Sequence, residues 1–533
     1  MDNTTPALLG LVLLMAASMA IGVAANKATE AGGGFLKGFF LGNRSLGSWS
    51  MALTATVMSG GTFMGFPSLI YSYGWVLALW IASYMMVPLC SFAVLGKRMG
   101  QLSRLTGAIT LPDLLRERFR SPALGMGASF LIIFILAFSL IAQFKGGAII
   151  LQAVLPTIPG VTDSAGIHIA DKSPAFIYGL IVFTIVVVSY TVYGGFLAAV
   201  WTDLFQSVLM AIGVLILFPL ALMKSGGLAA ATAAGVEQVG SGFAFAPGAN
   251  REFLPVTLAA SFFMMWSIAG MGQPASLVRM MAFRDTKTLR HAMFLLAIYN
   301  TLIYLPLVFT FICARAILKP LDRPDEVMPT LALTVANPWV AGLILAAPFG
   351  AVMATVSGFL VQISSAVVQD LYHRFINPHA PERTLRLLSQ WSIILIGAIA
   401  AFATLHSPKF LQAIVVFAGG AAASAFLVPS VMGAFWSRAT RQGAMAAMWT
   451  GMWTMLVFYG HGWYMNAFHP GYDPGIGEKG SFYPFYLFGV APYVWGLIFS
   501  AISGVVVSLM TPPPETQDVE LFFGTAEPQS ASG

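Results

Sequence analysis

Residues 51–75 read MALTATVMSGGTFMGFPSLIYSYGW. The stretch is apolar and long enough to cross a bilayer as a helix, which takes about 20 residues. The sequence Ser-Gly-Gly-Thr at 59–62 interrupts it near its middle, and Gly65 and Pro67 follow about a turn later. Because lipid offers no hydrogen-bond partners, the backbone freed by such a break must be buried in protein or line a cavity. The break therefore predicts either a solute and ion site or close packing against a neighbouring helix.

The composition is that of a membrane protein. Of the 533 residues, 58% are hydrophobic and 9% are charged, and the mean hydropathy is +0.80. Soluble domains carry about 25% charged residues, so we expect a polytopic protein surrounded by membrane lipid. The net charge of +6 does not indicate a nucleic-acid partner, because the basic residues lie in short loops between apolar stretches. Cys90 and Cys313 lie in apolar stretches and predict neither a disulfide framework nor a thiolate metal site.

Apolar stretches and the breakers between them predict an all-α polytopic fold with about 13 transmembrane helices. The expected spans are 7–25, 48–74, 77–96, 123–154, 174–194, 199–223, 254–278, 291–316, 338–369, 388–406, 410–436, 443–460 and 486–510. The first follows MDNTTP, which has no basic residue, so we interpret it as a retained span and not as a signal peptide. An odd number of spans puts the termini on opposite sides. Lys and Arg gather in alternate loops, which places the N-terminus outside and the C-terminus inside the cell.

A second apolar stretch is interrupted in the same way. Residues 262–279 read FFMMWSIAGMGQPASLVR, and Gly270, Gly272 and Pro274 break it. The interrupted stretches are the second and seventh expected spans, so they occupy matching places in two groups of five. This spacing is typical of an inverted repeat whose broken helices meet at a binding site. A chance pair of Gly- and Pro-containing helices is the alternative, because such helices are common in membranes.

Stretches spread along the chain resemble the sodium:solute symporter family. They are FLGNRSL at 40–46, SYTVYGGFLAAVWTDLFQSVLM at 189–210, GQPASLVR at 272–279 and SSAVVQDLY at 364–372. They fit the family's patterns FLG-x-RS-L, YT-x-x-GG-F-x-A with WTD-x-x-Q, GQP-x4-R and SS-x4-DLY. Within the family, the stretches that look most like the sodium/pantothenate symporter branch are LGKR at 95–98, ITLPDLL at 109–115 and QFKGG at 143–147.

This resemblance implies a LeuT-type fold of five plus five helices and alternating access driven by a sodium gradient. It implies a transporter rather than an enzyme, with no cofactor apart from sodium as the coupling ion. We expect the protein to work as a monomer in the bacterial inner membrane. The expected divisions are an extra N-terminal helix and loop at 1–47, the first repeat at 48–223, an outer loop at 224–253, the second repeat at 254–436, two extra helices at 437–511 and a tail at 512–533. Its prolines and acidic residues predict that the tail is disordered and cytoplasmic.

The resemblance also implies a sodium site between the first broken helix and the span at 338–369. Its ligands would be the carbonyl oxygens of Ala55, Met58 and Ala351 and the hydroxyl of Thr355. Where the family usually has a serine hydroxyl, this chain has Ala354, so a substitute water ligand, a weakened site and coupling to another cation all stay open. The resemblance places Asp203 on the inner ion route. An intramembrane carboxylate indicates function, and a helix cap is the alternative for this residue.

Lys145 lies inside the apolar stretch 123–154. A charge at that depth costs about 2.5–3.5 kcal/mol on insertion scales, so we expect it to face a partner or an aqueous cavity. Apart from Asp203, we expect no carboxylate at membrane depth to pair with it. Three interpretations stay open. Lys145 binds a carboxylate of the solute, it titrates in place of a coupling cation, or it snorkels or pairs with backbone carbonyls and has no role in transport.

The first interpretation agrees with the resemblance, because pantothenate carries a carboxylate together with amide and hydroxyl groups. The residues expected to contact the solute are Thr62, Gln143, Lys145, Trp266 and Gln273. The leading hypothesis is therefore sodium-coupled symport of a small organic anion, such as pantothenate. The alternatives are a proton-coupled or uncoupled transporter of an amino acid or monocarboxylate, and a transporter-like solute sensor. Residues at membrane depth offer no cluster of the kind an enzyme would need.

Overall fold

The computed structural model describes residues 5–30, 48–49, 52, 59–155, 173–245, 248, 254–407, 411–469 and 484–524. The α-helices are α1 (Thr5–Glu30), α4 (Phe66–Tyr73), α5 (Leu77–Val87), α6 (Lys97–Thr106), α7 (Leu111–Phe119), α8 (Pro122–Val154), α9 (Pro174–Lys224), α10 (Leu228–Val239), α11 (Val256–Ser267), α12 (Pro274–Met281), α13 (Thr286–Ile317), α14 (Val327–Val335), α15 (Pro338–Ser365), α16 (Glu382–Thr404), α17 (Leu411–Phe435), α18 (Arg441–Phe468), α19 (Pro492–Met510) and α20 (Thr516–Phe523). The 3-10 and π-helical segments are η2 (Gly61–Gly65), η3 (Gly74–Val76), η4 (Pro88–Gly96), η5 (Ser241–Ala244), η6 (Ala269–Gly272), η7 (Pro324–Glu326), η8 (Ala366–Ile376) and η9 (Leu487–Gly489).

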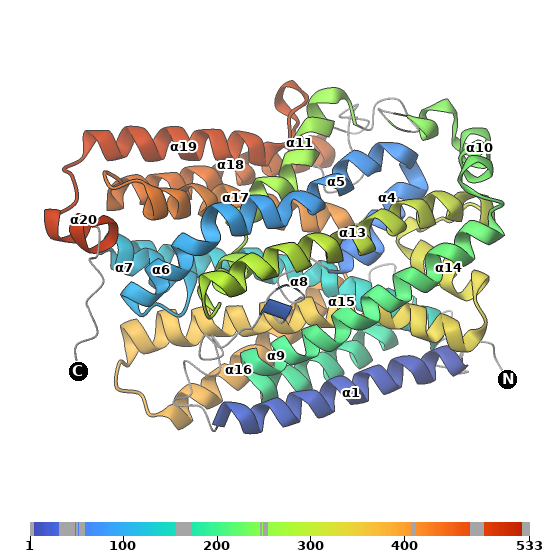
Figure 1. The fold of residues 1–533 in the computed structure, drawn as a ribbon, viewed down its shortest axis with the longest axis horizontal. Helices are drawn as coiled ribbons and strands as arrows, with labels where there is room; N and C mark the ends of the chain where they lie inside the picture. The colour runs from blue at the N-terminus through green and yellow to red at the C-terminus, as the bar shows by residue number, and fades with distance from the viewer. Residues whose placement is uncertain are drawn as a thin grey trace.

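The long helices run close to the long axis of the molecule (Figure 1). The short helices α7 and α20 lie at one end of this axis, and α10 lies at the other. These are called the α7 end and the α10 end. In the part of the chain that the structure describes, nine helical stretches are long and apolar enough to cross a membrane. The shorter apolar stretches Thr5–Ile21 and Val256–Ser267 add to them, and the number 13 stays a prediction.

The first predicted break lies where the described part of its helix begins. Residues 53–58, with the predicted sodium ligands Ala55 and Met58, lie outside the described residues. From Gly60 onward the backbone is helical. The Ser59 carbonyl accepts from the Thr62 amide at 3.0 Å, and the π-helical segment η2 precedes the regular α4.

Glycines at this break let two glutamine side chains approach the backbone. Gln143 Oε1 accepts from the Gly60 amide at 2.7 Å, and a Cβ at Gly60 would lie 2.9 Å from that oxygen. A Cβ at Gly65 would overlap the side chain of Gln412. The break thus serves close packing, which is one of its two interpretations. Ser59 also lines a cavity, as the other interpretation requires.

The second break is present where the sequence predicts it. After α11, η6 forms a 3-10 turn and Gln273 has an extended backbone, with φ −69° and ψ 122°. Pro274 then begins α12, because proline disfavours helix in the residue before it and suits the first turn of a helix. Gly272 lies against α17, where a Cβ would be 2.8 Å from the Cα of Ala423. The broken helix therefore packs tightly on one side.

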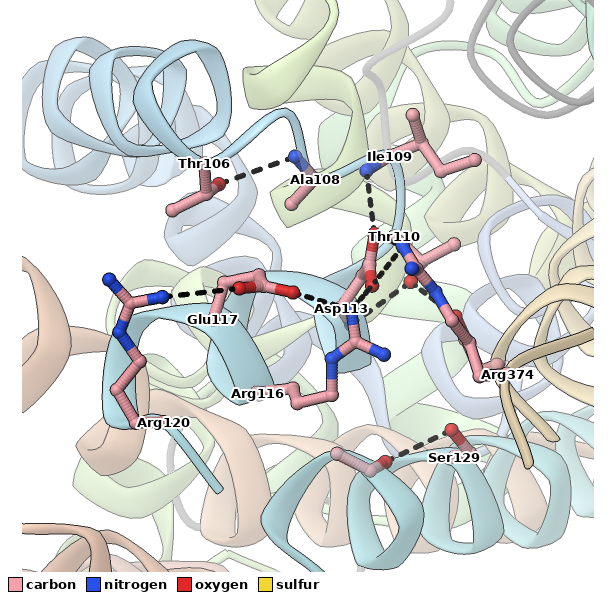
Figure 2. A network of polar contacts seen from close by, with 12 residues as sticks. Thr106, Ala108, Ile109, Thr110, Asp113, Arg116, Glu117, Arg120, Ser129 and Arg374 are labelled. Carbon is pink, nitrogen blue, oxygen red and sulfur yellow. Dashed lines mark hydrogen bonds and ion pairs between the residues drawn. The ribbon is translucent and has the colours of Figure 1, made fainter. Parts of the chain in front are cut away.

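Asp113 is the centre of a polar network at the α7 end (Figure 2). Arg116 Nη2 and Arg374 Nη2 lie 2.8 and 3.1 Å from Asp113 Oδ1. The Asp113 amide donates to Thr110 Oγ1, which caps α7, and this hydroxyl donates to Asp370 Oδ1 at 2.7 Å. The motifs ITLPDLL and SS-x4-DLY therefore meet here, where they join α7 to η8.

The prediction of a disordered tail at 512–533 is wrong for its first part, because α20 is a helix docked on the α7 end. Phe522 is 3% exposed, and the Arg118 guanidinium lies 5.1 Å from its ring centroid and 5.0 Å from that of Phe523. Arg98 Nη2 donates to the Phe522 carbonyl. Cation–π contacts of this kind stabilise docking. Composition alone predicts disorder because it does not show that two phenylalanines contact basic residues of α6 and α7.

Candidate functional site

A cavity of about 90 Å³ lies beside the second broken helix and between α8, α9, α15 and α17. It has room for several water molecules, since each needs roughly 10–15 Å³. Along α15 it extends from Ala354 to Gln362, and on α12 it reaches Arg279. Because α15 ends near η8 at the α7 end, the cavity extends from the two breaks toward that end.

Three of the predicted solute residues, Gln143, Gln273 and Trp266, line this cavity. Gln143 holds the Gly60 amide, as described above, and Gln273 Nε2 donates to the Gly419 carbonyl at 2.8 Å. Each glutamine therefore fixes one wall of the cavity to a neighbouring backbone. The arrangement presents amide groups on both sides of the space, one from α8 and one from the second break.

Trp266 also lines the cavity, and it belongs to a stack of aromatic rings. Its ring lies 4.8 Å from that of Tyr84, which lies 4.4 Å from that of Tyr304. Trp266 Nε1 is buried and has no hydrogen-bond partner among the described residues, so it is a candidate donor to a solute. Thr62 is buried behind the stack, with its hydroxyl 3.3 Å from that of Tyr304, and is not part of the cavity wall.

Asp203 and Arg279 form a buried ion pair at the cavity wall. Arg279 Nη2 lies 2.9 Å from Asp203 Oδ2, and the side chains are 16% and 5% exposed. Asp203 Oδ1 has no partner within the described ranges. The WTD and GQP-x4-R motifs thus meet in one contact between α9 and α12. The alternative role of Asp203 as a helix cap is wrong, because the backbone of α9 is helical on both sides of it.

The predicted sodium ligands of α15 lie together. Thr355 Oγ1 is 2.9 Å from the Ala351 carbonyl oxygen, to which it donates. Ala354 and Thr355 line the cavity, so the methyl group of Ala354 stands where a serine would present a hydroxyl. The opposite half of the predicted site, at Ala55 and Met58, lies outside the described residues.

Lys145 does not line the cavity but lies just beyond it, two residues along α8 from Gln143 toward the α10 end. Its Nζ is 2.6 Å from Asp325 Oδ2, and the side chains are 6% and 3% exposed. The expectation that only Asp203 could pair with it at this depth is wrong. Asp325 belongs to η7, in the connection between α13 and α14, and this connection folds inward to reach α8. An acidic residue in a loop of mixed charge gives no sequence signal of such burial.

The comparisons with known proteins agree with this architecture. Residues 39–451 match the family model of the sodium:solute symporter family. A sodium/pantothenate symporter of Haemophilus influenzae is 31% identical, over 82% of this chain and 87% of that protein. A sodium/pantothenate symporter of Escherichia coli is 30% identical, over 79% and 83%. A sodium/proline symporter of Haemophilus influenzae is 29% identical, over 92% of each chain.

Two solved structures share the fold. A substrate-bound, outward-open Na+-coupled sialic acid symporter has a TM-score of 0.70 at 17% identity and covers 96% of this chain and 100% of its own. A nucleobase-cation-symport-1 family transporter in a closed conformation has a TM-score of 0.53 at 13% identity, with 91% and 97% covered. At these identities the likeness concerns the fold alone, which is the all-helical fold of cation-coupled symporters.

Proposed function

The chain belongs to the sodium:solute symporter family, and from this membership we propose that it carries a small organic carboxylate, such as pantothenate, into the cell. It is a solute symporter and a multi-pass protein of the bacterial inner membrane, and sodium is the coupling ion that its family implies. We further propose which residues bind the solute and that the helices form two repeats of five.

One observation carries the proposal for a carboxylate. Lys145, a buried cation between the cavity and the α10 end, already binds a carboxylate, that of Asp325. A lysine at this depth needs an anionic partner or water. The two pantothenate symporters noted above are similar to this chain over most of their length. The amides of Gln143 and Gln273 and the Trp266 indole would contact the remaining polar and apolar groups of the solute.

Sodium would bind on the α15 side of the first broken helix. The carbonyl of Ala351 and the hydroxyl of Thr355 are adjacent oxygens, and helix breaks in transporters supply further carbonyls to a cation. We assign these further carbonyls to Ala55 and Met58. Asp203 and its partner Arg279 line the space between this site and the α7 end, which suits an ion route.

We assign the α7 end to the cytoplasm, because basic residues favour that side of a membrane. The basic residues of α6 and α7 gather there and include Arg104, Arg116 and Arg118. The cavity would then extend toward the cytoplasm, and the contacts of Lys145 and the aromatic stack would close it from outside.

Uptake into proteoliposomes tests the function. We expect labelled pantothenate to accumulate several-fold above equilibrium with an inward sodium gradient, and not with choline in place of sodium. Equal accumulation with sodium and with choline would reject sodium coupling. Accumulation of proline without any of pantothenate would instead reject the proposed solute.

A proton-coupled mechanism is the second candidate, and Ala354 is the observation that favours it, because one expected hydroxyl ligand is missing. An inward proton gradient in sodium-free buffer separates the two. Uptake driven by that gradient alone supports the second candidate. No uptake under these conditions, together with uptake in sodium, supports the first.

A further inference from the structure

Asp325 joins three elements on the side of the cavity that faces the α10 end. Its Oδ2 accepts from Lys145 Nζ on α8 at 2.6 Å and from the amide of Leu411, the first residue of α17, at 3.0 Å. The segment η7, which carries Asp325, packs against η2, α4 and α8. One carboxylate oxygen therefore holds the connection between α13 and α14 against α8 and the start of α17.

These contacts form a preorganised binding site for a carboxylate. Lys145 supplies a buried positive charge. The first amides of α17 have no acceptor within their own helix, and the dipole of this helix favours an anion at its start. Removing one member of a buried ion pair leaves an uncompensated charge, which is strongly unfavourable. A carboxylate that replaced Asp325 would find the same two donors.

The closed arrangement leaves another polar group unsatisfied. Gln412, the residue after Leu411, is fully buried, and neither of its amide atoms has a hydrogen-bond partner among the described residues. Its side chain lies against Gly61 and Gly65, so the amide meets water only if the start of α17 moves away from η2. An unpaired buried amide is unfavourable. The closed state therefore needs contacts that offset the unpaired amide of Gln412. The bonds of Asp325 supply them, because they hold the start of α17 in place.

We propose that Asp325 is a gate residue. It occupies the carboxylate site of Lys145 and Leu411 while the path from the α10 end is closed, and the carboxylate of the solute takes its place when that path opens. The identity of the solute rests on the proposed function, whereas the gate does not. The exchange couples recognition of the solute to opening of the path. When η7 moves away, Lys145 loses the carboxylate of Asp325, and only a solute with a carboxylate replaces that negative charge.

The first test measures opening without any solute. The reporter is Thr62→Cys in a protein whose Cys90 and Cys313 are replaced by alanine, since Thr62 is buried in η2 beneath η7. A membrane-impermeant maleimide is added to vesicles of each orientation. We expect Asp325→Asn to raise the labelling rate from one side by about tenfold or more, because the labelling rate follows the open population when opening and closing are fast relative to the reaction with maleimide.

The matched control is Glu326→Gln on the same segment. Glu326 lies 3.9 Å from Arg323 in a partly exposed ion pair, so its loss should leave the labelling rate unchanged. If Asp325→Asn prevents folding, the double variant Lys145→Gln with Asp325→Asn removes both charges and leaves neither unpaired. It should label about tenfold or more faster than the protein that keeps both residues. Labelling of the double variant at the wild-type rate overturns the gate.

The second test measures exchange. Asp325→Asn removes the internal competitor for Lys145, so the KM for the carboxylate solute should fall several-fold while the maximal rate also falls. A contact that is merely structural would lower the amount of folded protein and leave KM unchanged. Fast labelling together with an unchanged KM for pantothenate supports the gate and rejects binding of the solute carboxylate by Lys145. Slow labelling rejects the gate, whatever the solute.

Discussion

The ion pair between Asp203 and Arg279 offers a quantitative prediction. At 2.9 Å, two unit charges attract by about 6 kcal/mol in a medium of effective dielectric constant near 20. Much of this attraction offsets the desolvation of the two groups, yet removal of one partner from a buried pair typically costs about 3–5 kcal/mol. We therefore expect Asp203→Asn and Arg279→Gln each to lower the thermal unfolding midpoint of the purified protein markedly.

The double variant, Asp203→Asn with Arg279→Gln, decides between a coupled pair and two independent contributions. Because it leaves no unpaired charge, it should recover most of the stability that each single variant loses. The matched control is Arg284→Gln, which removes an exposed ion pair with Asp285 and should change the midpoint little. Losses that simply add in the double variant would refute the reasoning.

Three further predictions follow from individual positions. Ala354→Ser should lower the half-saturating sodium concentration of uptake several-fold, since it adds the hydroxyl that the family usually has, and an unchanged value would mean that the site is complete without it. Gly65→Ala should destabilise the protein by about 1–3 kcal/mol through overpacking against Gln412, whereas Gly358→Ala, with open space around it, should leave the unfolding midpoint nearly unchanged. Removal of residues 515–533 should lower that midpoint, because Arg118 loses the rings of α20, and an unaltered midpoint would mean that docking contributes nothing.

The sequence predicts the second broken helix, where Gly272 and Pro274 favour a backbone break and the structure has one. Pro306 and Pro348, however, lie within continuous helices. The break at Gln273 and Pro274 is present in the structure, and the first break is described from Ser59 onward. Glycine does not tell whether a break binds a solute or packs tightly. At Gly60 and Gly65 the structure has close packing, with the cavity beside it.

Contacts between distant segments could not be predicted from the sequence. The motifs contain both Asp203 and Arg279, yet nothing in either motif indicates that they pair. Asp325 lies in a connection that looks solvated, and burial of its carboxylate depends on Lys145, far away in the chain. The rings of Tyr84 and Tyr304 look like ordinary core residues, so their place beside the candidate site has no sequence signal.

Competition for uptake shows whether the protein recognises the carboxylate of the solute. Proteoliposomes with an inward sodium gradient take up labelled pantothenate in competition with unlabelled pantothenate or with its alcohol analogue, in which a CH₂OH group replaces the carboxylate. If Lys145 recognises the carboxylate, unlabelled pantothenate inhibits uptake and the alcohol does not, and Lys145→Ala raises the KM for pantothenate by about tenfold or more, the loss of one charge-assisted contact. Equal inhibition by the acid and the alcohol, with an unchanged KM in Lys145→Ala, would contradict the account.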